Sequence, residues 1–245
     1  MSVLLIPIAP LTRTKSRLRD CFSKEQLKDL TKAMFKDLAN TLSQVRYFDY
    51  KIVYCNSPEI LELAEEYGLI GIKEHLTVPR KSFDEVISEL NEIAVKKFHA
   101  HQTVFTFLDI ILISEKNFYE IHTLMENYQL VVCPAIHSAG ISILGRKPPD
   151  IISTFFSDPN VTSLVALLNE ANAIKLRIAI YDSFRAGFDI DIKQDLVLAY
   201  EYLKIFNLTE TSTFRFLKTN LKLSLYKKNL KDNRSLEVRK VKSLK

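Results

Sequence analysis

Three basic residues, Arg13, Lys15 and Arg17, lie within five positions of one another shortly after the first apolar segment of the chain. An arginine can bind two phosphate oxygens through its planar guanidinium, and a lysine acts as a point charge. In an open α/β sheet, ligands bind at the carboxyl ends of the strands, where a loop after the first strand lies. The spacing fits a triphosphate-binding loop, but a charged loop that only faces solvent is the commoner case for such a pattern.

Aspartates form a second group of candidate residues. Asp109 follows the most hydrophobic segment of the chain, and a carboxylate buried there is costly unless it is paired, hydrogen-bonded or bound to a cation. Asp189 and Asp191 lie on the same side of an extended segment, because side chains alternate with period two. One carboxylate from each segment would be enough to hold Mg²⁺, which prefers oxygen ligands. For Asp189 and Asp195, capping of a helix that begins just after them is the alternative.

Other kinds of active site have no signature in the chain. The five histidines are not spaced as metal ligands, and they fit surface or packing roles. There is no nucleophile elbow, no Walker phosphate loop and no G-x-G-x-x-G segment. Because the chain has only five glycines, we expect it to hold any phosphate mainly through charge.

The composition is that of an ordinary globular protein. Of the 245 residues, 47% are hydrophobic and 26% are charged, and a chain of this length can bury one substantial core. No apolar run reaches the roughly 18 residues of a membrane span, and the N-terminus enters an apolar segment without the features of a secretory signal. The three widely spaced cysteines indicate neither a disulfide framework nor a zinc site. We expect a cytoplasmic protein that does not bind membranes.

Apolar runs and helical patterns alternate along the chain. Ser23 and Gln26 form a capping box ahead of a stripe of apolar residues at helical spacing. The alternation predicts an α/β fold with a mostly parallel mixed sheet and helices on both faces. The predicted strands are 3–8, 50–54, 69–72, 103–108, 130–134, 141–144 and 177–181. The predicted helices are 23–45, 58–67, 82–97, 115–127, 161–172 and 193–206, and the leucines of 217–225 fit an additional helix or strand.

Two blocks of the sequence resemble one known family, the 2-phospho-L-lactate guanylyltransferases. Val3–Leu18 is similar to the opening of these proteins, where an apolar strand and a proline lead into K-S-R-L. Tyr181–Asp191, followed by Asp195 and Leu196, resembles the closing motif of the archaeal members. The resemblance runs in order over about residues 3–206.

The resemblance implies a nucleotidyltransferase fold like that of the nucleotide-diphospho-sugar transferases. It also implies a reaction of GTP with 2-phospho-L-lactate or a related phospho-acid such as phosphoenolpyruvate. The phosphate of the acid would attack the α-phosphorus of GTP, giving lactyl-2-diphospho-5′-guanosine and pyrophosphate in the biosynthesis of coenzyme F-420. Such a transfer depends on positioning and charge neutralisation.

The resemblance also assigns roles to residues. Lys15 and Arg17 would be the catalytic residues that hold the triphosphate, and Asp109 and Asp191, with Asp189, would carry Mg²⁺. The nucleotide-binding residues that it implies are Pro7, Arg13, Lys15, Ser16, Arg17 and Asp84.

The acceptor pocket departs from the family's pattern. Ser138–Ser142 stands in place of G-G-T-N, so Ile141 occupies the position of an expected threonine. An isoleucine cannot donate a hydrogen bond to a phosphate or carboxylate. Asp84 stands where the family pattern has an asparagine. The diverged acceptor pocket consists of Ile141, Ser142, Ser157 and Asn160. A second hypothesis is therefore a catalytically diverged paralogue that binds a nucleotide as a regulatory or partner-binding module.

Positive charge is concentrated at the C-terminus. Residues 218–245 contain ten Lys or Arg and two acidic residues, a net charge of +8, whereas the whole chain carries +5 and the remainder therefore −3. We expect a nucleotidyltransferase domain over 1–206 and a basic C-terminal extension over 207–245. Binding of nucleic acid is one role for such a segment, and we favour a solvated tail. A homodimer formed through an apolar face is a further expectation.

Overall fold

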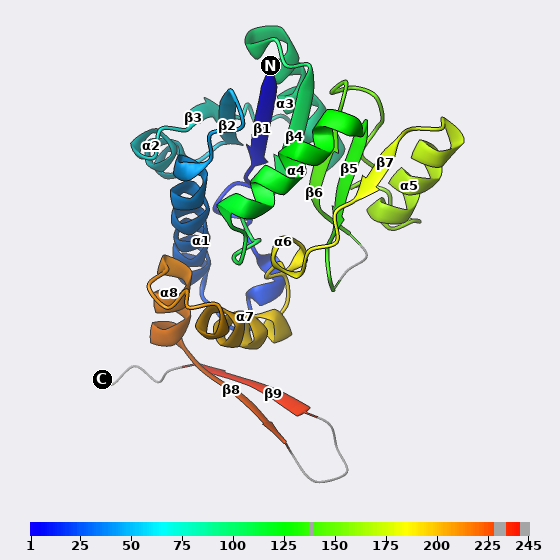
Figure 1. The fold of residues 1–245 in the computed structure, drawn as a ribbon. Coiled ribbons are helices and arrows are strands. Elements are labelled where there is room, and N and C mark those ends of the chain that lie inside the picture. The colour runs from blue at the N-terminus through cyan, green and yellow to red at the C-terminus, as the bar shows by residue number, and fades with distance from the viewer. Residues whose placement is uncertain (138–139, 228–233, 241–245) are drawn as a thin grey trace. The chain divides into compact units, whose positions relative to one another are not determined.

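The computed structural model describes residues 1–137, 140–227 and 234–240 (Figure 1). The chain forms two compact units, of which the first contains Met1–Pro10 and Leu38–Asp189. The second contains Leu11–Asp37 and Ile190–Lys245. Helix α1 (Lys24–Gln44) begins in the second unit and ends in the first.

The first unit is built on a seven-stranded sheet with the order β3-β2-β1-β4-β6-β5-β7. Only β6 runs antiparallel to its neighbours, while the other pairs are parallel. This arrangement confirms the predicted mostly parallel mixed sheet. The strands are β1 (Ser2–Pro7), β2 (Tyr50–Cys55), β3 (Ile70–Lys73), β4 (Gln102–Thr106), β5 (Leu130–Pro134), β6 (Ile141–Arg146) and β7 (Ile178–Ile180).

Helices cover both faces of this sheet, as expected for strands that are apolar on both sides. On one face, Leu90 of α3 and Leu167 of α5 share a core with Leu144 of β6. On the other face, α4 approaches Gly145 so closely that an added Cβ would lie 2.4 Å from the sulfur of Met125. The helices of this unit are α2 (Pro58–Glu66), α3 (Phe83–Phe98), α4 (Glu115–Asn127), α5 (Ser163–Ala173) and the short α6 (Phe184–Gly187).

The second unit is mainly helical. It contains a 3₁₀ turn η1 (Ser16–Leu18), the start of α1, α7 (Lys193–Ile205), α8 (Ser212–Asn220) and the antiparallel strands β8 (Leu221–Lys227) and β9 (Arg234–Lys240). The capping box is confirmed, because Gln26 and Ser23 exchange hydrogen bonds of 3.0 and 3.2 Å. The start of α8 is fixed to α1, since the backbone amides of Ser212 and Thr213 donate to Asp37.

Most predicted elements are confirmed, but the short helix α6 was not predicted and one predicted strand is too long. The strand predicted over 103–108 ends at Thr106, because the ring of Phe107 turns to pack 5.8 Å from Phe83 and 5.7 Å from Phe156. Near the C-terminus, the segment expected as a helix or a strand contains both, since Leu217 lies in α8 and Leu221 begins β8. Ser138 and Ala139 of the predicted pocket segment, and residues 228–233 and 241–245 of the predicted extension, lie outside the described residues. Among the described residues, no helix is long and apolar enough to cross a membrane.

Candidate functional site

Asp109 is held at the carboxyl end of β4 by the residues that follow it. Its carbonyl accepts a hydrogen bond of 3.0 Å from the amide of Ile111, which closes a tight turn. The side chains of Ile110 and Leu112 are buried, so the turn is anchored by apolar contacts. The carbonyl of Leu112 also accepts a hydrogen bond of 2.7 Å from Nε of Arg185. The turn therefore leaves the carboxylate of Asp109 half-buried in a fixed position.

Asp189 is positioned by the close approach of α6 to β5. A Cβ on Gly187 would lie 2.6 Å from the carbonyl oxygen of Pro134, so only glycine allows this contact without a shift of the backbone. The carbonyl of Gly187 accepts a hydrogen bond of 2.9 Å from Ile136, and Phe188 is buried. The chain therefore leaves the end of β5 with the half-buried Asp189 in a defined place.

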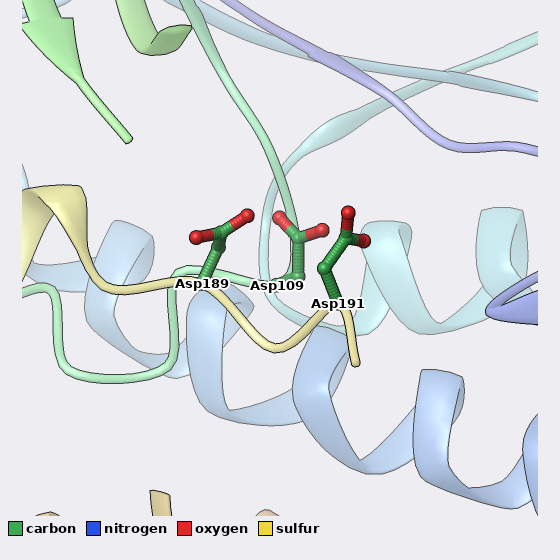
Figure 2. A group of neighbouring side chains, drawn as sticks. All are labelled: Asp109, Asp189 and Asp191. Atoms are coloured by element: carbon green, nitrogen blue, oxygen red, sulfur yellow. The ribbon is translucent and has the colours of Figure 1, made fainter. Parts of the chain in front are cut away.

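The first unit brings Asp109 and Asp189 together, although the two residues come from segments far apart in the sequence. Each offers a carboxylate oxygen, and these oxygens lie within 4.8 Å of one another. Two carboxylates at this separation repel each other unless a cation or a hydrogen-bond donor lies near them, and oxygen ligands of this kind suit a hard divalent cation. Figure 2 shows these two side chains with Asp191, which follows Asp189 by two residues along the chain.

In the second unit, Asp191 pairs with two residues of the predicted triphosphate loop. Nζ of Lys15 lies 3.2 Å from one oxygen of Asp191, and Nη1 of Arg17 lies 2.7 Å from the other. The Lys15 side chain is only 8% exposed, against 68% for Arg17 and 37% for Asp191. Nζ of Lys15 also donates to the carbonyl of Ile190. The pairing brings a predicted phosphate-binding lysine and arginine to a predicted metal ligand.

The backbone at Lys15 is unusual, because its φ of 46° lies in the left-handed region. Residues other than glycine adopt this region rarely and at some cost, and they do so mainly where the surroundings enforce it. At Lys15 this conformation directly precedes the turn η1. The other predicted nucleotide-binding residues of the loop, Arg13 and Ser16, are exposed, whereas Pro7 is the buried last residue of β1.

Asp195 caps the start of α7. Its Oδ2 accepts hydrogen bonds of 2.8 Å from the amides of both Asp191 and Ile192, which satisfies donors that have no partner inside the helix. This confirms the capping alternative for Asp195. The cap also fixes the backbone of Asp191, so that its carboxylate is presented from an ordered helix start.

The first unit also contains a cavity of about 710 Å³ between α3 and the segment 150–160. Asp84, Ser157 and Asn160 line it, which brings a predicted nucleotide-binding residue together with two predicted acceptor residues. The other two acceptor residues are part of the sheet: Ile141 is buried in the apolar core, and Ser142 donates a hydrogen bond of 3.0 Å to the carbonyl of Cys133. The predicted acceptor group is therefore divided between the cavity and the strand β6.

Asp84 lines this cavity and binds the segment 150–160. Its carboxylate accepts hydrogen bonds from the hydroxyl of Thr154, from the amide of Phe156 at 2.8 Å and from the amide of Ser157 at 2.7 Å. Partial burial alone would raise the pKa of Asp84, but these hydrogen bonds outweigh it and lower the pKa below its ordinary value. Asp84 is therefore an ionised anchor for the wall of the cavity.

The same cavity is also lined by Arg146, Asp150 and Thr154, which no motif in the sequence marks. Arg146 is the last residue of β6 and is 4% exposed. An arginine at the end of a strand is usually exposed, so its type and position carried no signal of burial. The only local hint was the Pro-Pro pair at 148–149, which ends the strand and returns the chain toward α3.

Comparison with known proteins relates the chain to one family. The model of the family described as "Guanylyl transferase CofC like" matches residues 1–238. The 2-phospho-L-lactate guanylyltransferase of Methanocaldococcus jannaschii is 28% identical over 194 residues, which cover 79% of this chain and 80% of that protein. The protein of the same name from Methanobrevibacter ruminantium is 27% identical over 198 residues, covering 78% and 82%.

Solved structures with the same fold are more distant in sequence. A protein of Desulfovibrio desulfuricans described as a nucleotide-diphospho-sugar transferase has a TM-score of 0.70 at 14% identity, covering 89% of this chain and 94% of that one. The 4-diphosphocytidyl-2C-methyl-D-erythritol synthase of Anaerococcus prevotii has a TM-score of 0.60 at 12% identity, covering 83% and 96%. These likenesses show the fold alone, and it is the predicted nucleotide-diphospho-sugar transferase-like fold.

Proposed function

The chain belongs to the CofC-like guanylyl transferase family of nucleotidyltransferases, and from this premise we propose that it transfers the guanylyl group of GTP to 2-phospho-L-lactate. A related phospho-acid such as phosphoenolpyruvate is the second candidate acceptor. A phosphate oxygen of the acid attacks the α-phosphorus, the bond to the β-phosphate oxygen breaks, and pyrophosphate leaves. The product, lactyl-2-diphospho-5′-guanosine, serves the biosynthesis of coenzyme F-420.

The observation that carries the proposal is the approach of Asp109 and Asp189 to within 4.8 Å of each other. We propose that these two carboxylates and that of Asp191 hold Mg²⁺. The donor set fits this ion, because Mg²⁺ prefers oxygen ligands and binds through a few carboxylates while substrate phosphates complete its coordination. The chemistry that bound Mg²⁺ supplies is neutralisation of charge on the reacting phosphates.

Lys15 and Arg17 are proposed to bind the triphosphate. Both now pair with Asp191, and a cation on this aspartate would weaken its attraction for the two basic side chains. Lys15 and Arg17 would then be available to phosphate oxygens, Arg17 through two parallel hydrogen bonds and Lys15 as a point charge. Arg13, Ser16, Pro7 and Asp84 remain proposed contributors to nucleotide binding.

The experiment that tests the proposal measures pyrophosphate release from the purified protein in the presence of Mg²⁺. Each nucleoside triphosphate is combined with 2-phospho-L-lactate, phosphoenolpyruvate or 3-phosphoglycerate. The proposal expects release that requires both GTP and one acid, and loss of release in Asp109→Asn. The matched control is Asp29→Asn, which removes an exposed surface carboxylate paired with Lys32. Release without an acid, or full activity of Asp109→Asn, would contradict the proposal.

A second candidate is a catalytically diverged paralogue that binds a nucleotide as a regulatory or partner-binding module. It is favoured by Ile141, whose side chain offers no hydrogen-bond donor where the family pattern has a threonine. The same experiment separates the two candidates. Binding of GTP without release of pyrophosphate with any of the acids would support the paralogue.

Several further expectations stay predictions. They are the division into a nucleotidyltransferase domain over 1–206 and a basic extension over 207–245, formation of a homodimer, a cytoplasmic location, and a solvated rather than nucleic-acid-binding tail. Removal of residues 218–245 tests the last of these, because retention of RNA or DNA by the full chain alone would show binding through the extension.

A further inference from the structure

Arg146 is the buried cation of the cavity between α3 and the segment 150–160. Its Nη1 donates a hydrogen bond of 2.7 Å to the carbonyl of Ile152, but Nε and Nη2 have no acceptor within the described part of the chain. Burial lowers the pKa of Arg146 to about 10, and the charge of Asp150 opposes this shift. The side chain is therefore still protonated at neutral pH.

A charged guanidinium with two unpaired donors is costly when the residue is only 4% exposed. A buried charged group with unpaired donors loses its hydration without compensation. Among the residues that the structure describes, no salt bridge compensates Arg146, since Asp150 acts on it only through its charge at longer range. The free Nε and Nη2 form one edge of the guanidinium, and such an edge suits the two oxygens of a carboxylate or phosphate. An anionic ligand in the cavity would satisfy both donors.

The direction of the side chain relates Arg146 to the carboxyl end of β4. The backbone of Arg146 is paired with Thr103, but its guanidinium carbon lies 5.2 Å from the centre of the Phe105 ring. Phe105 is two residues nearer to the end of β4. The side chain therefore lies against the ring of Phe105, one pair of residues nearer to the end of β4 that Asp109 follows.

The charges around the cavity select the kind of anion. Asp84, Glu85, Asp150 and Asp158 line it together with the single cation of Arg146. A polyphosphate would be repelled by this acidic lining, whereas one carboxylate bound directly to the guanidinium is compatible with it. The hydroxyl of Ser157 and the amide of Asn160 add neutral polar groups. The lining therefore fits a small acid better than a nucleotide.

We propose that Arg146 binds the carboxylate of the acceptor acid and makes that carboxylate a requirement for efficient transfer. The inference rests on the proposed guanylyl transfer. Arg146 supplies hydrogen-bond donors that Ile141 cannot provide, and these donors lie in the cavity lined by Ser157 and Asn160.

The test combines a change in the protein with a change in the substrate. Isopropyl phosphate is 2-phospho-L-lactate with a methyl group in place of the carboxylate. Wild type should prefer the natural acid in kcat/KM by at least about 30-fold, because hydrogen bonds to a charged group are strong. In Arg146→Met this preference should fall at least about tenfold, through a higher KM for the acid at unchanged KM for GTP. Arg146→Lys keeps the charge but not the paired donors, so its preference for the acid should lie between those of wild type and Arg146→Met.

The preference between the two substrates separates binding from a merely structural role, because a damaged fold would lower turnover of both equally. An unchanged preference in both variants would overturn the inference while leaving guanylyl transfer intact. If wild type transfers to no acid, calorimetry of 2-phospho-L-lactate decides instead. Binding that is lost in Arg146→Met would support the carboxylate site without the reaction, and binding that is absent or equal in both proteins would overturn it.

Discussion

The hydrogen bonds of Asp84 allow a quantitative prediction about how the cavity wall is held. Asp84→Ala removes the acceptor of three donors, the hydroxyl of Thr154 and the amides of Phe156 and Ser157. A hydrogen bond to a charged group contributes about 1.5–3 kcal/mol, but Asp84 is half-exposed and Ser157 is exposed, so water replaces part of what is lost. We expect a net loss of about 2 kcal/mol in the free energy of unfolding. For a domain of this size that corresponds to a Tm lower by roughly 4–8 °C.

The pH dependence of this loss follows from the sign of the pKa shift. The hydrogen bonds lower the pKa of Asp84 in the folded state below its ordinary value of 3.8. Folding therefore favours the ionised carboxylate, and the stabilisation is fully present above the ordinary pKa. It disappears as the pH falls through the folded-state pKa. The difference in stability between wild type and Asp84→Ala should be largest near neutral pH and shrink in strong acid.

Thermal and urea unfolding at several pH values measure this difference. The control is Asp84→Asn, which can still accept hydrogen bonds from Thr154 and Phe156 through its carbonyl oxygen but cannot accept the one from Ser157. It should lose about half as much stability, roughly 1 kcal/mol. Equal stability of wild type and Asp84→Ala at neutral pH, or a difference that does not depend on pH, would refute the reasoning.

Four substitutions test the remaining roles. Asp109→Asn or Asp191→Asn should lower the Mg²⁺-dependent kcat at least about 100-fold with little change in Tm. Titration with Mg²⁺ measures the first effect, and thermal unfolding followed by circular dichroism measures the second. Full activity of both variants would contradict the proposed metal site. Lys15→Ala should weaken GTP binding about tenfold in calorimetry, whereas an unchanged affinity would exclude this residue from triphosphate binding. Ile141→Thr introduces a hydroxyl in place of an apolar side chain that is buried in the core, so we expect a stability loss of about 1–2 kcal/mol. A lower KM for the acid despite this loss would show that a threonine at this position binds the acceptor directly.

Local signals made the sheet and its carboxylates predictable. Asp109 was found because it ends an apolar run, and Asp189 because it alternates with Asp191 in an extended segment. Both signals depend on residues that are neighbours in sequence. The approach of Asp109 and Asp189 to within 4.8 Å agrees with the expectation that one carboxylate from each segment could hold Mg²⁺.

What the sequence did not reveal depends on contacts between distant residues. The buried state of Arg146 is set by Ile152, Phe105 and α3, and a lone arginine at the end of a strand gives no sign of them. Helix α8 has a local cap, since the hydroxyl of Thr211 accepts a hydrogen bond of 3.3 Å from the amide of Phe214. The hydrogen bonds from its first amides to Asp37, by contrast, join residues far apart in the sequence, and no local pattern contains them. The early end of β4 has the same origin, because Phe107 packs with rings from two other segments.

We propose that the guanylyl group passes from GTP to a phospho-acid. This transfer is tested most directly with GTP labelled at the α-phosphate, incubated with the protein, Mg²⁺ and 2-phospho-L-lactate or phosphoenolpyruvate. We expect the label to appear in a diphosphate that contains the acid, in an amount equal to the pyrophosphate released, and only when the acid is present. Label found only in GTP or in GMP, with GTP bound normally, would contradict it.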